Sequence, residues 1–375
     1  VLARTTDAPK GTKGISLFLV PKFEVTDDGI VGSRNGVSTN SIESKMGIKG
    51  SPTCVLNFEN SKGVMIGPKN KGLSSMFTMM NLERIVVGVQ GLGIAETAYQ
   101  NAVAYSKERK QGKANNSKNG ETDLIIKHAD IRRSLMNMKS IIEGQRSFAF
   151  WLSQQIDVSL SHDDKNVRGD ASNMVALLTP VIKSFFSDNG VEITNDAIQV
   201  FGGYGYTKDQ GIEQLFRDNR ITPIYEGTNS VQAIDLVYRK ISSEGIFENF
   251  IKSMDNEIKN YKSEKNLENF LNIFEKYKEI LVSFTKWMRE KINSNKDDAS
   301  AACNDYLKVL GYTALAFAWI KTLKISFEKQ NTNKEFYEDK INTGKYYFEK
   351  ILPRAQSHYI VGTSGSHTTM NAKFN

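Results

Sequence analysis

The sequence predicts a mainly α-helical protein with a partial β domain near its N-terminus. Between residues 14 and 60, short runs of β-branched and aromatic residues alternate with clusters of Gly, Pro, Asp and Asn, as strands and turns do. From about residue 72 onward, apolar residues recur at helical spacing over long stretches. With 375 residues, of which 39% are hydrophobic, the chain can bury a large core in two or three domains.

The β region contains two clear candidate strands, at residues 15–20 and 54–58. The segment before them, from Val1 to Thr5, resembles the second part of a strand that begins further upstream. It carries no initiator Met and neither a secretory signal nor a transit pattern. We therefore expect further residues upstream of Val1.

Four helices are expected between residues 72 and 202. The first, at 72–105, contains Gly88, Gly91 and Gly93, which lower helix propensity and would be explained by close helix packing. A polar loop at 111–121, a second helix around 131–156 and a polar break at 161–169 follow. A third helix is expected at 172–188, where Pro180 should introduce a kink, and a fourth from about Asn195 to the glycine-rich turn at 202–205.

Amphipathic stretches continue after residue 245 and predict further helices at 258–288, 301–326 and 336–352. The expected domains are therefore a partial β domain at 1–68, a helical bundle at 69–242 and an additional helical domain at 243–375.

Composition excludes some classes of protein. No run of about 18 apolar residues exists, so no membrane-spanning segment is expected. The net charge of +7, from 49 Lys and Arg against 42 Asp and Glu, favours anionic partners only slightly and is explained most simply by surface lysines. Cys54 and Cys303 lie far apart, which favours a reducing compartment, the cytoplasm by default, and the four histidines have no metal-ligand spacing.

Two glycine-containing clusters could carry chemistry. In the first, Gln199 precedes a run at 201–206 whose glycines could bring backbone N–H groups close to a phosphate, although a helix C-cap followed by a turn explains paired glycines more often. In the second, Glu226 lies between Tyr225 and Gly227. Partial desolvation raises the pKa of a carboxyl group toward the range that a general base needs, whereas spacing alone favours an exposed turn residue.

Two basic positions also need partners. Arg84 lies beside Asn81 in the middle of an apolar helix and requires an anion, either a structural carboxylate, which is the simpler choice, or a ligand phosphate. Arg109 lies in a basic segment at 107–113, at a helix C-terminus where cations also suit the helix dipole.

Taken in order, these motifs resemble the acyl-CoA dehydrogenase family over essentially the whole chain. Segments that resemble the second half of that family's middle β domain lie at 2–5, 14–21 and 45–53. Segments that resemble its four-helix bundle lie at 81–84, 108–110, 199–203, 217–218 and 224–228. The long subfamily that includes 3-methylmercaptopropionyl-CoA dehydrogenase is resembled at 126–133, 178–181 and 351–354, the last of which closes the additional helical domain.

The resemblance implies FAD-dependent α,β-dehydrogenation of an acyl-CoA thioester, either 3-methylmercaptopropionyl-CoA or a fatty acyl-CoA. It implies that Glu226 is the base that removes the α-proton. The substrate would be bound by Asn81, Arg84, Tyr225 and Gly227. The FAD would be contacted, partly across a subunit interface, by Arg109, Gln199, Gly202, Gly203 and Thr228.

The resemblance also implies partners, and at some positions this sequence differs from the pattern of the family. An electron-transfer flavoprotein would accept the electrons, and the protein would form a homodimer or homotetramer without nucleic acid. Gln111 and Gly112 stand where shorter members place an aromatic residue, and Ser230 stands where they often place Gln. The family's N-terminal helical domain and the first part of its β domain would lie upstream of Val1.

Three other functions remain open from the sequence. An acyl-CoA oxidase would use the same base but pass its electrons to oxygen. A flavin-bearing nucleic-acid-binding relative of this fold would need a concentrated Lys/Arg face, whereas the charges here are interspersed with acids. A noncatalytic helical scaffold would not depend on Glu226.

Overall fold

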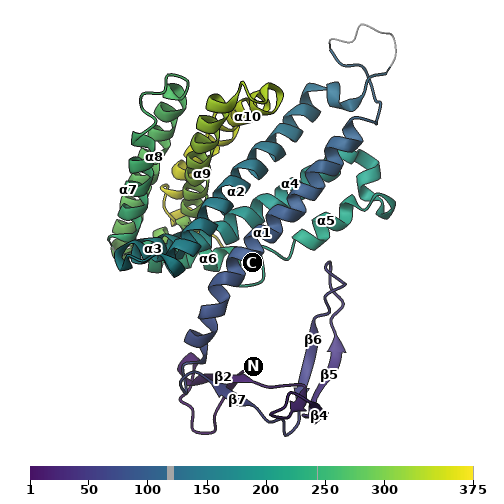
Figure 1. Cartoon of the computed structure of the whole chain (residues 1–375), viewed down its shortest axis with the longest axis vertical. Helices are drawn as coiled ribbons and strands as arrows, with labels where there is room; N and C mark the ends of the chain where they lie inside the picture. Colours follow the sequence, from purple (N-terminus) through teal and green to yellow (C-terminus); the bar gives the residue numbers. More distant parts are fainter. Residues whose placement is uncertain (116–121, 243, 375) are drawn as a thin grey trace. The chain divides into compact units, whose positions relative to one another are not determined.

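The computed structural model describes residues 1–115, 122–242 and 244–374, and these divide into two compact units, Val1–Arg84 and Ile85–Asn375 (Figure 1). The predicted class, mainly helical with a partial β part, is confirmed. The division into domains at residues 68 and 242 stays a prediction. The expected loop at 111–121 falls partly on residues 116–121, which lie outside the described residues.

The first unit contains three small antiparallel sheets. One has the order β1-β2-β7, formed by Leu2–Arg4, Ile15–Leu19 and Val64–Ile66. The others pair β3 (Phe23–Val25) with β4 (Val31–Arg34), and β5 (Val37–Ile42) with β6 (Cys54–Phe58). The predicted strands at 15–20 and 54–58 correspond to β2 and β6. Apolar strand residues such as Leu19, Val31 and Val64 are exposed, so these sheets bury little core by themselves.

The long helix α1 (Gly72–Ser106) begins in the first unit and continues into the second. At its first residue, a Cβ on Gly72 would lie 2.3 Å from the carbonyl carbon of Ser16, so strand β2 and the helix start can meet only because this residue is glycine. Within the second unit, Gly88 and Gly91 lie against Ile182 and Ser187 respectively, whereas a Cβ on Gly93 would meet nothing within 4 Å. Close packing therefore explains two of the three helix glycines.

The bundle helices differ from the predicted pattern after α2 (Ala129–Ser161). Helix α3 (Lys165–Val181) begins inside the expected polar break, because the Asp164 side chain accepts a hydrogen bond from the backbone N–H of Asn166 at 2.8 Å and caps the helix. The predicted separate helix from Asn195 is also wrong. The chain stays helical through the π-helical turn η3 (Ile182–Phe186) into α4 (Ser187–Phe201), and the turn begins two residues after Pro180, which has no N–H to donate.

The C-terminal helices pack around α9. They comprise α7 (Ile246–Lys259), α8 (Glu268–Ser294), α9 (Lys296–Lys329), α10 (Lys334–Tyr346), the π-helical turn η7 (Tyr347–Ile351), α11 (Arg354–Gly362) and α12 (His367–Met370). The helix predicted at 258–288 corresponds to α8 but begins too early, because α7 ends at Lys259 and the chain turns before α8 begins at Glu268. Most of α9 is buried, including Tyr306 and Trp319, and α8 and α10 lie beside it (Figure 1).

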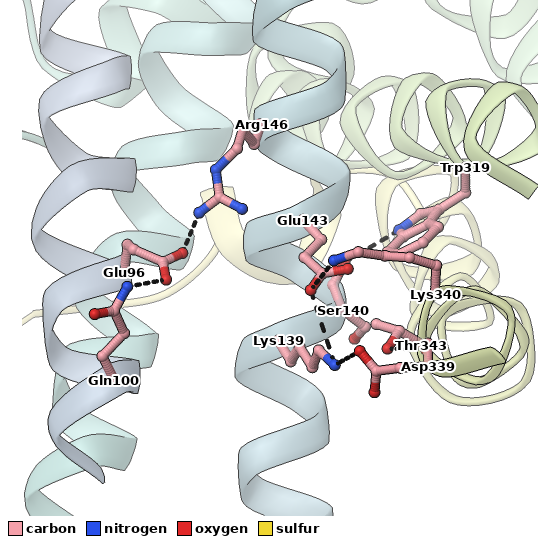
Figure 2. Close-up of polar contacts among 10 residues, drawn as sticks. All are labelled: Glu96, Gln100, Lys139, Ser140, Glu143, Arg146, Trp319, Asp339, Lys340 and Thr343. Atoms are coloured by element: carbon pink, nitrogen blue, oxygen red, sulfur yellow. Dashed lines mark hydrogen bonds and ion pairs between the residues drawn. The ribbon is translucent and has the colours of Figure 1, made fainter. Parts of the chain in front are cut away.

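Polar contacts tie the C-terminal helices to the bundle, as Figure 2 shows. Glu143 on α2 pairs with Lys340 on α10 at 2.7 Å, and Lys139 on α2 pairs with Asp339. The indole N–H of Trp319 on α9 donates to the backbone oxygen of Ser140 on α2 at 3.1 Å. Because these bonds lie on consecutive turns of α2, they fix the bundle and the additional helices as one packed unit.

Candidate active site

The turn between α5 (Ile212–Asn219) and α6 (Asn229–Asp235) carries Glu226 in an uncommon backbone conformation. Its φ is 59°, in the left-handed region, and the φ of Gly227 is 85°. Glycine adopts this region at little cost, but a residue with a side chain is seldom found there. Such conformations persist where the surroundings over-determine them, and they cluster at functional sites. The half-buried side chain of Glu226 therefore leaves the backbone in a direction that an ordinary turn would not provide.

Hydrogen bonds on both sides hold this turn. The backbone N–H of Tyr225 donates to the oxygen of Ile221 at 3.1 Å, and that of Asn229 donates to the oxygen of Pro223 at 3.0 Å. The Tyr225 hydroxyl donates to the side-chain oxygen of Gln90 on α1. Thr228 caps α6 by accepting from the N–H of Val231 at 3.4 Å.

The structure thus brings four of the predicted site residues, Tyr225, Glu226, Gly227 and Thr228, onto one turn. It also adds a residue that the motifs did not single out. Gln232 is fully buried, and its side-chain nitrogen donates to the backbone oxygen of Glu226 at 3.1 Å and to that of Gly227 at 3.5 Å.

A second set of predicted residues lines a pocket of about 570 Å³ where the C-terminal ends of α1 and α4 meet. Arg109, Gln199, Gly202 and Gly203 are all among its lining residues. These four groups come together within one chain. The expected contact of FAD partly across a subunit interface stays a prediction.

Short backbone bonds hold Arg109 at the pocket. Its N–H donates to the oxygen of Tyr105 at 2.9 Å, and its own oxygen accepts from the N–H of Ile125 at 2.8 Å. Its guanidinium lies 5.6 Å from the ring centroid of Tyr204, within range of a cation–π contact. Tyr105 in turn stacks on Phe201 with the ring centroids 4.2 Å apart.

The pocket has features that suit a phosphate-bearing ligand. Gly202 has a φ of 61°, and a Cβ on Gly202 or Gly203 would meet nothing within 4 Å, so ligand atoms can approach the backbone here. The N–H of Gly202 donates to the oxygen of Gln199, so the feature that suits a phosphate here is the Arg109 guanidinium beside this open stretch of backbone. Gln111 lines the pocket at the place where an aromatic residue was expected, while Tyr204 and Tyr105 supply aromatic surface from other positions. Tyr204 follows the predicted Gly203 directly, so the motif itself could have identified it.

The other two predicted substrate-binding residues lie on the part of α1 that belongs to the first unit. Asn81 is exposed. Arg84 is only 8% exposed, and its guanidinium lies 5.5 Å from the ring centroid of Phe77. An arginine that buried needs stabilising partners, and the aromatic ring provides one.

The described residues contain neither a metal-binding cluster nor a membrane-spanning helix. Over residues 1–115, 122–242 and 244–374, no group of three or more His, Cys, Asp and Glu side chains is placed to hold a metal ion. None of the helices in these ranges is both long enough and apolar enough to cross a membrane.

Comparison with protein families matches two models that adjoin each other along the chain. Residues 70–241 match the C-terminal domain of acyl-CoA dehydrogenases, and residues 250–373 match a domain described as acetyl-CoA dehydrogenase C-terminal like. Both regions lie where the sequence motifs place the bundle and the additional helices.

Curated relatives extend the likeness. The 3-methylmercaptopropionyl-CoA dehydrogenase of Ruegeria pomeroyi is 40% identical over 245 residues, which is 65% of this chain and 42% of the relative. A butyryl-CoA dehydrogenase of Syntrophomonas wolfei is 32% identical over 368 residues, which is 94% of this chain and 60% of the relative. The chain therefore spans roughly half the length of these relatives.

Solved structures share the fold. Caenorhabditis elegans ACDH-11, solved in complex with C11-CoA, aligns with a TM-score of 0.74 at 22% identity and covers 100% of this chain and 60% of its own. An acyl-CoA dehydrogenase from Bacillus anthracis complexed with FAD aligns with a TM-score of 0.72 at 20% identity, over 99% of this chain and 62% of its own.

Proposed function

Since the chain belongs to the acyl-CoA dehydrogenase family, we propose that the protein containing it removes hydrogen from the α- and β-carbons of an acyl-CoA thioester, with FAD as the cofactor. The observation that carries the proposal is the backbone of Glu226, which is held in the left-handed region by the turn that the family motif occupies.

Glu226 is the base in this proposal. A proton α to a thioester is only weakly acidic, so its removal near neutral pH needs a fixed base and donors that stabilise the developing enolate oxygen. The half-buried Glu226 carboxylate would take the proton, and a backbone N–H of the Glu226–Gly227 turn is the proposed donor. FAD, when bound, would supply the acceptor for the β-hydrogen, which leaves as hydride.

The pocket at the ends of α1 and α4 is the proposed site for the ADP part of FAD, with Thr228 on the catalytic turn as a further proposed contact. Arg109, Gln199, Gly202 and Gly203 would hold the pyrophosphate and its surroundings, because they combine a cation with open backbone. Arg109→Glu should then lower the flavin content of the purified protein. Lys107→Glu is the matched control, since it makes the same charge change outside the pocket lining. Equal flavin content in both variants would argue against this site.

Arg84, with Asn81, is proposed to bind the CoA portion, and Tyr225 and Gly227 to line the acyl end. The proposed substrates are 3-methylmercaptopropionyl-CoA or a short fatty acyl-CoA such as butyryl-CoA, the classes named for the two relatives. An electron-transfer flavoprotein is proposed as the acceptor of the electrons, and a homodimer or homotetramer as the assembly.

The test is anaerobic reduction of the flavin-loaded protein by a panel of these acyl-CoAs, followed by visible absorbance. Glu226→Gln keeps the shape of the side chain and removes its basicity, so it should retain flavin and lose reduction by about 10²-fold or more. Reduction by the variant at above about a tenth of the normal rate would refute the assignment of the base. Rapid reoxidation of the reduced protein by air would instead favour an acyl-CoA oxidase.

A further inference from the structure

The left-handed backbone of Glu226 needs a physical cause. Outside glycine, this conformation is held only when neighbouring groups restrict the peptide, because relaxation to an ordinary turn would lower the local energy. The hydrogen bonds at Tyr225 and Asn229 fix the two ends of the turn, but neither of them restrains the carbonyl groups of Glu226 and Gly227.

The amide of Gln232 supplies that restraint. It lies on α6, is fully buried, and donates to the carbonyl oxygens of both Glu226 and Gly227 at 3.1 and 3.5 Å. The orientation of the amide follows from these contacts, since a flipped amide would set its oxygen against two carbonyl oxygens. In the observed orientation, the side-chain oxygen of Gln232 is buried without a hydrogen-bond partner among the described residues. Leaving a buried acceptor unpaired is unfavourable, so the orientation is set by the two bonds that the side-chain nitrogen donates to the turn.

A buried polar cluster fixes the start of α6, from which Gln232 projects. The side-chain oxygen of Asn229 accepts from the fully buried amine of Lys183 at 2.8 Å, and its nitrogen donates to a carboxylate oxygen of Asp188 at 2.6 Å and to the backbone oxygen of Ser184 at 3.2 Å. All three of these partners lie on the π-helical turn or at the start of α4. Because Asn229 is saturated with directional bonds, α6 cannot rotate, and the donor of Gln232 stays opposite the two carbonyl groups.

We propose that Gln232 is a positioning residue for the reaction: its buried amide holds the Glu226–Gly227 segment in the left-handed conformation that sets the direction of the Glu226 carboxylate. The inference rests on the proposed function of Glu226 as the base. Gln232 touches neither substrate nor cofactor in this account and acts only through the backbone of the base.

Two substitutions test the proposal in the flavin-loaded protein. Gln232→Met removes the donor at similar length, and Gln232→Glu keeps the shape but replaces the donor with a carboxylate that faces two carbonyl oxygens. Misplacement of a reacting group by about 1 Å costs on the order of 10²-fold in rate. Both variants should therefore reduce their flavin roughly 10- to 100-fold more slowly at saturating acyl-CoA, with flavin content and substrate Kd unchanged.

The matched control is Tyr306→Phe, which removes a different buried hydrogen bond, the one of 2.9 Å between Tyr306 and Thr285. This control should lose thermal stability and keep the normal rate of flavin reduction. The proposal is overturned if either Gln232 variant reduces flavin at the normal rate, or if both lose their flavin, since Gln232 would then support flavin binding or the fold and not the direction of the base. Glu226→Gln, run alongside, separates the two claims, because a fully active Glu226→Gln would refute the proposed base whatever Gln232 does.

Discussion

Gly88→Ala probes the contact between α1 and the π-helical turn η3. A Cβ at this position would lie 2.6 Å from both the backbone oxygen and the side-chain Cγ2 of Ile182. The side-chain atom could move, but the backbone oxygen belongs to a buried helical turn and could do so only if the helices separate. Overpacking of this kind costs about 1–3 kcal/mol.

Gly93→Ala on the same helix isolates that cost, since a Cβ there would meet nothing within 4 Å. Both substitutions gain the same helix propensity, about 1 kcal/mol, so the difference in unfolding free energy between the two variants equals the overpacking cost alone. Urea unfolding should show Gly93→Ala more stable than Gly88→Ala by about 1–3 kcal/mol at an unchanged m-value. Equal midpoints for the two variants would refute the close helix contact.

Two further predictions concern ionisation. A hydrogen bond from Arg289 lowers the pKa of Glu248 to about 2. A carboxyl group with a lowered pKa stabilises the fold at pH values above its pKa in the unfolded chain, which is 4.5. Glu248→Gln should lower the free energy of unfolding by less than about 1 kcal/mol, because the ion pair is partly exposed. This loss should shrink as the pH falls from 4.5 toward 2, and a loss that stays constant with pH in urea titrations would contradict the prediction. Burial raises the pKa of Cys303 to about 12. Peptide mapping after iodoacetamide treatment at pH 8 should therefore find Cys54 labelled at least about tenfold faster than Cys303. Equal labelling of the two cysteines would contradict this prediction.

Local periodicity was enough to predict α1, α2 and the strands β2 and β6, because those elements depend on which residues recur along the chain. It could not distinguish Gly88 from Gly93, since the same residue type on the same helix meets a backbone oxygen in one case and open space in the other. The early start of α3 was readable, because Asp164 has the character of an N-cap. The continuation of that helix through the π-helical turn η3 into α4 was not, because a π-helical turn has no comparable pattern.

The candidate site, too, could be predicted from the sequence only in part. The motifs predicted Glu226 and the pocket residues by type and order, and Arg109 and the Gln199–Gly203 segment line one pocket in the structure. Neither the left-handed φ of Glu226 nor the role of Gln232 is readable from the residues alone. Both depend on where α6 lies, which Asn229 determines through contacts with a segment more than 40 residues earlier in the chain.

The central claim, that Glu226 removes the α-proton, is tested most directly by hydrogen exchange on an acyl-CoA analogue in which sulfur replaces the β-carbon. Because no β-hydrogen is present, hydride cannot leave and only the proton step can occur. In D₂O, the flavin-loaded protein should catalyse incorporation of deuterium at the α-carbon, measured by mass spectrometry of the recovered analogue. Glu226→Gln should slow this exchange by about 10²-fold or more, while exchange at the normal rate in that variant would refute Glu226 as the base.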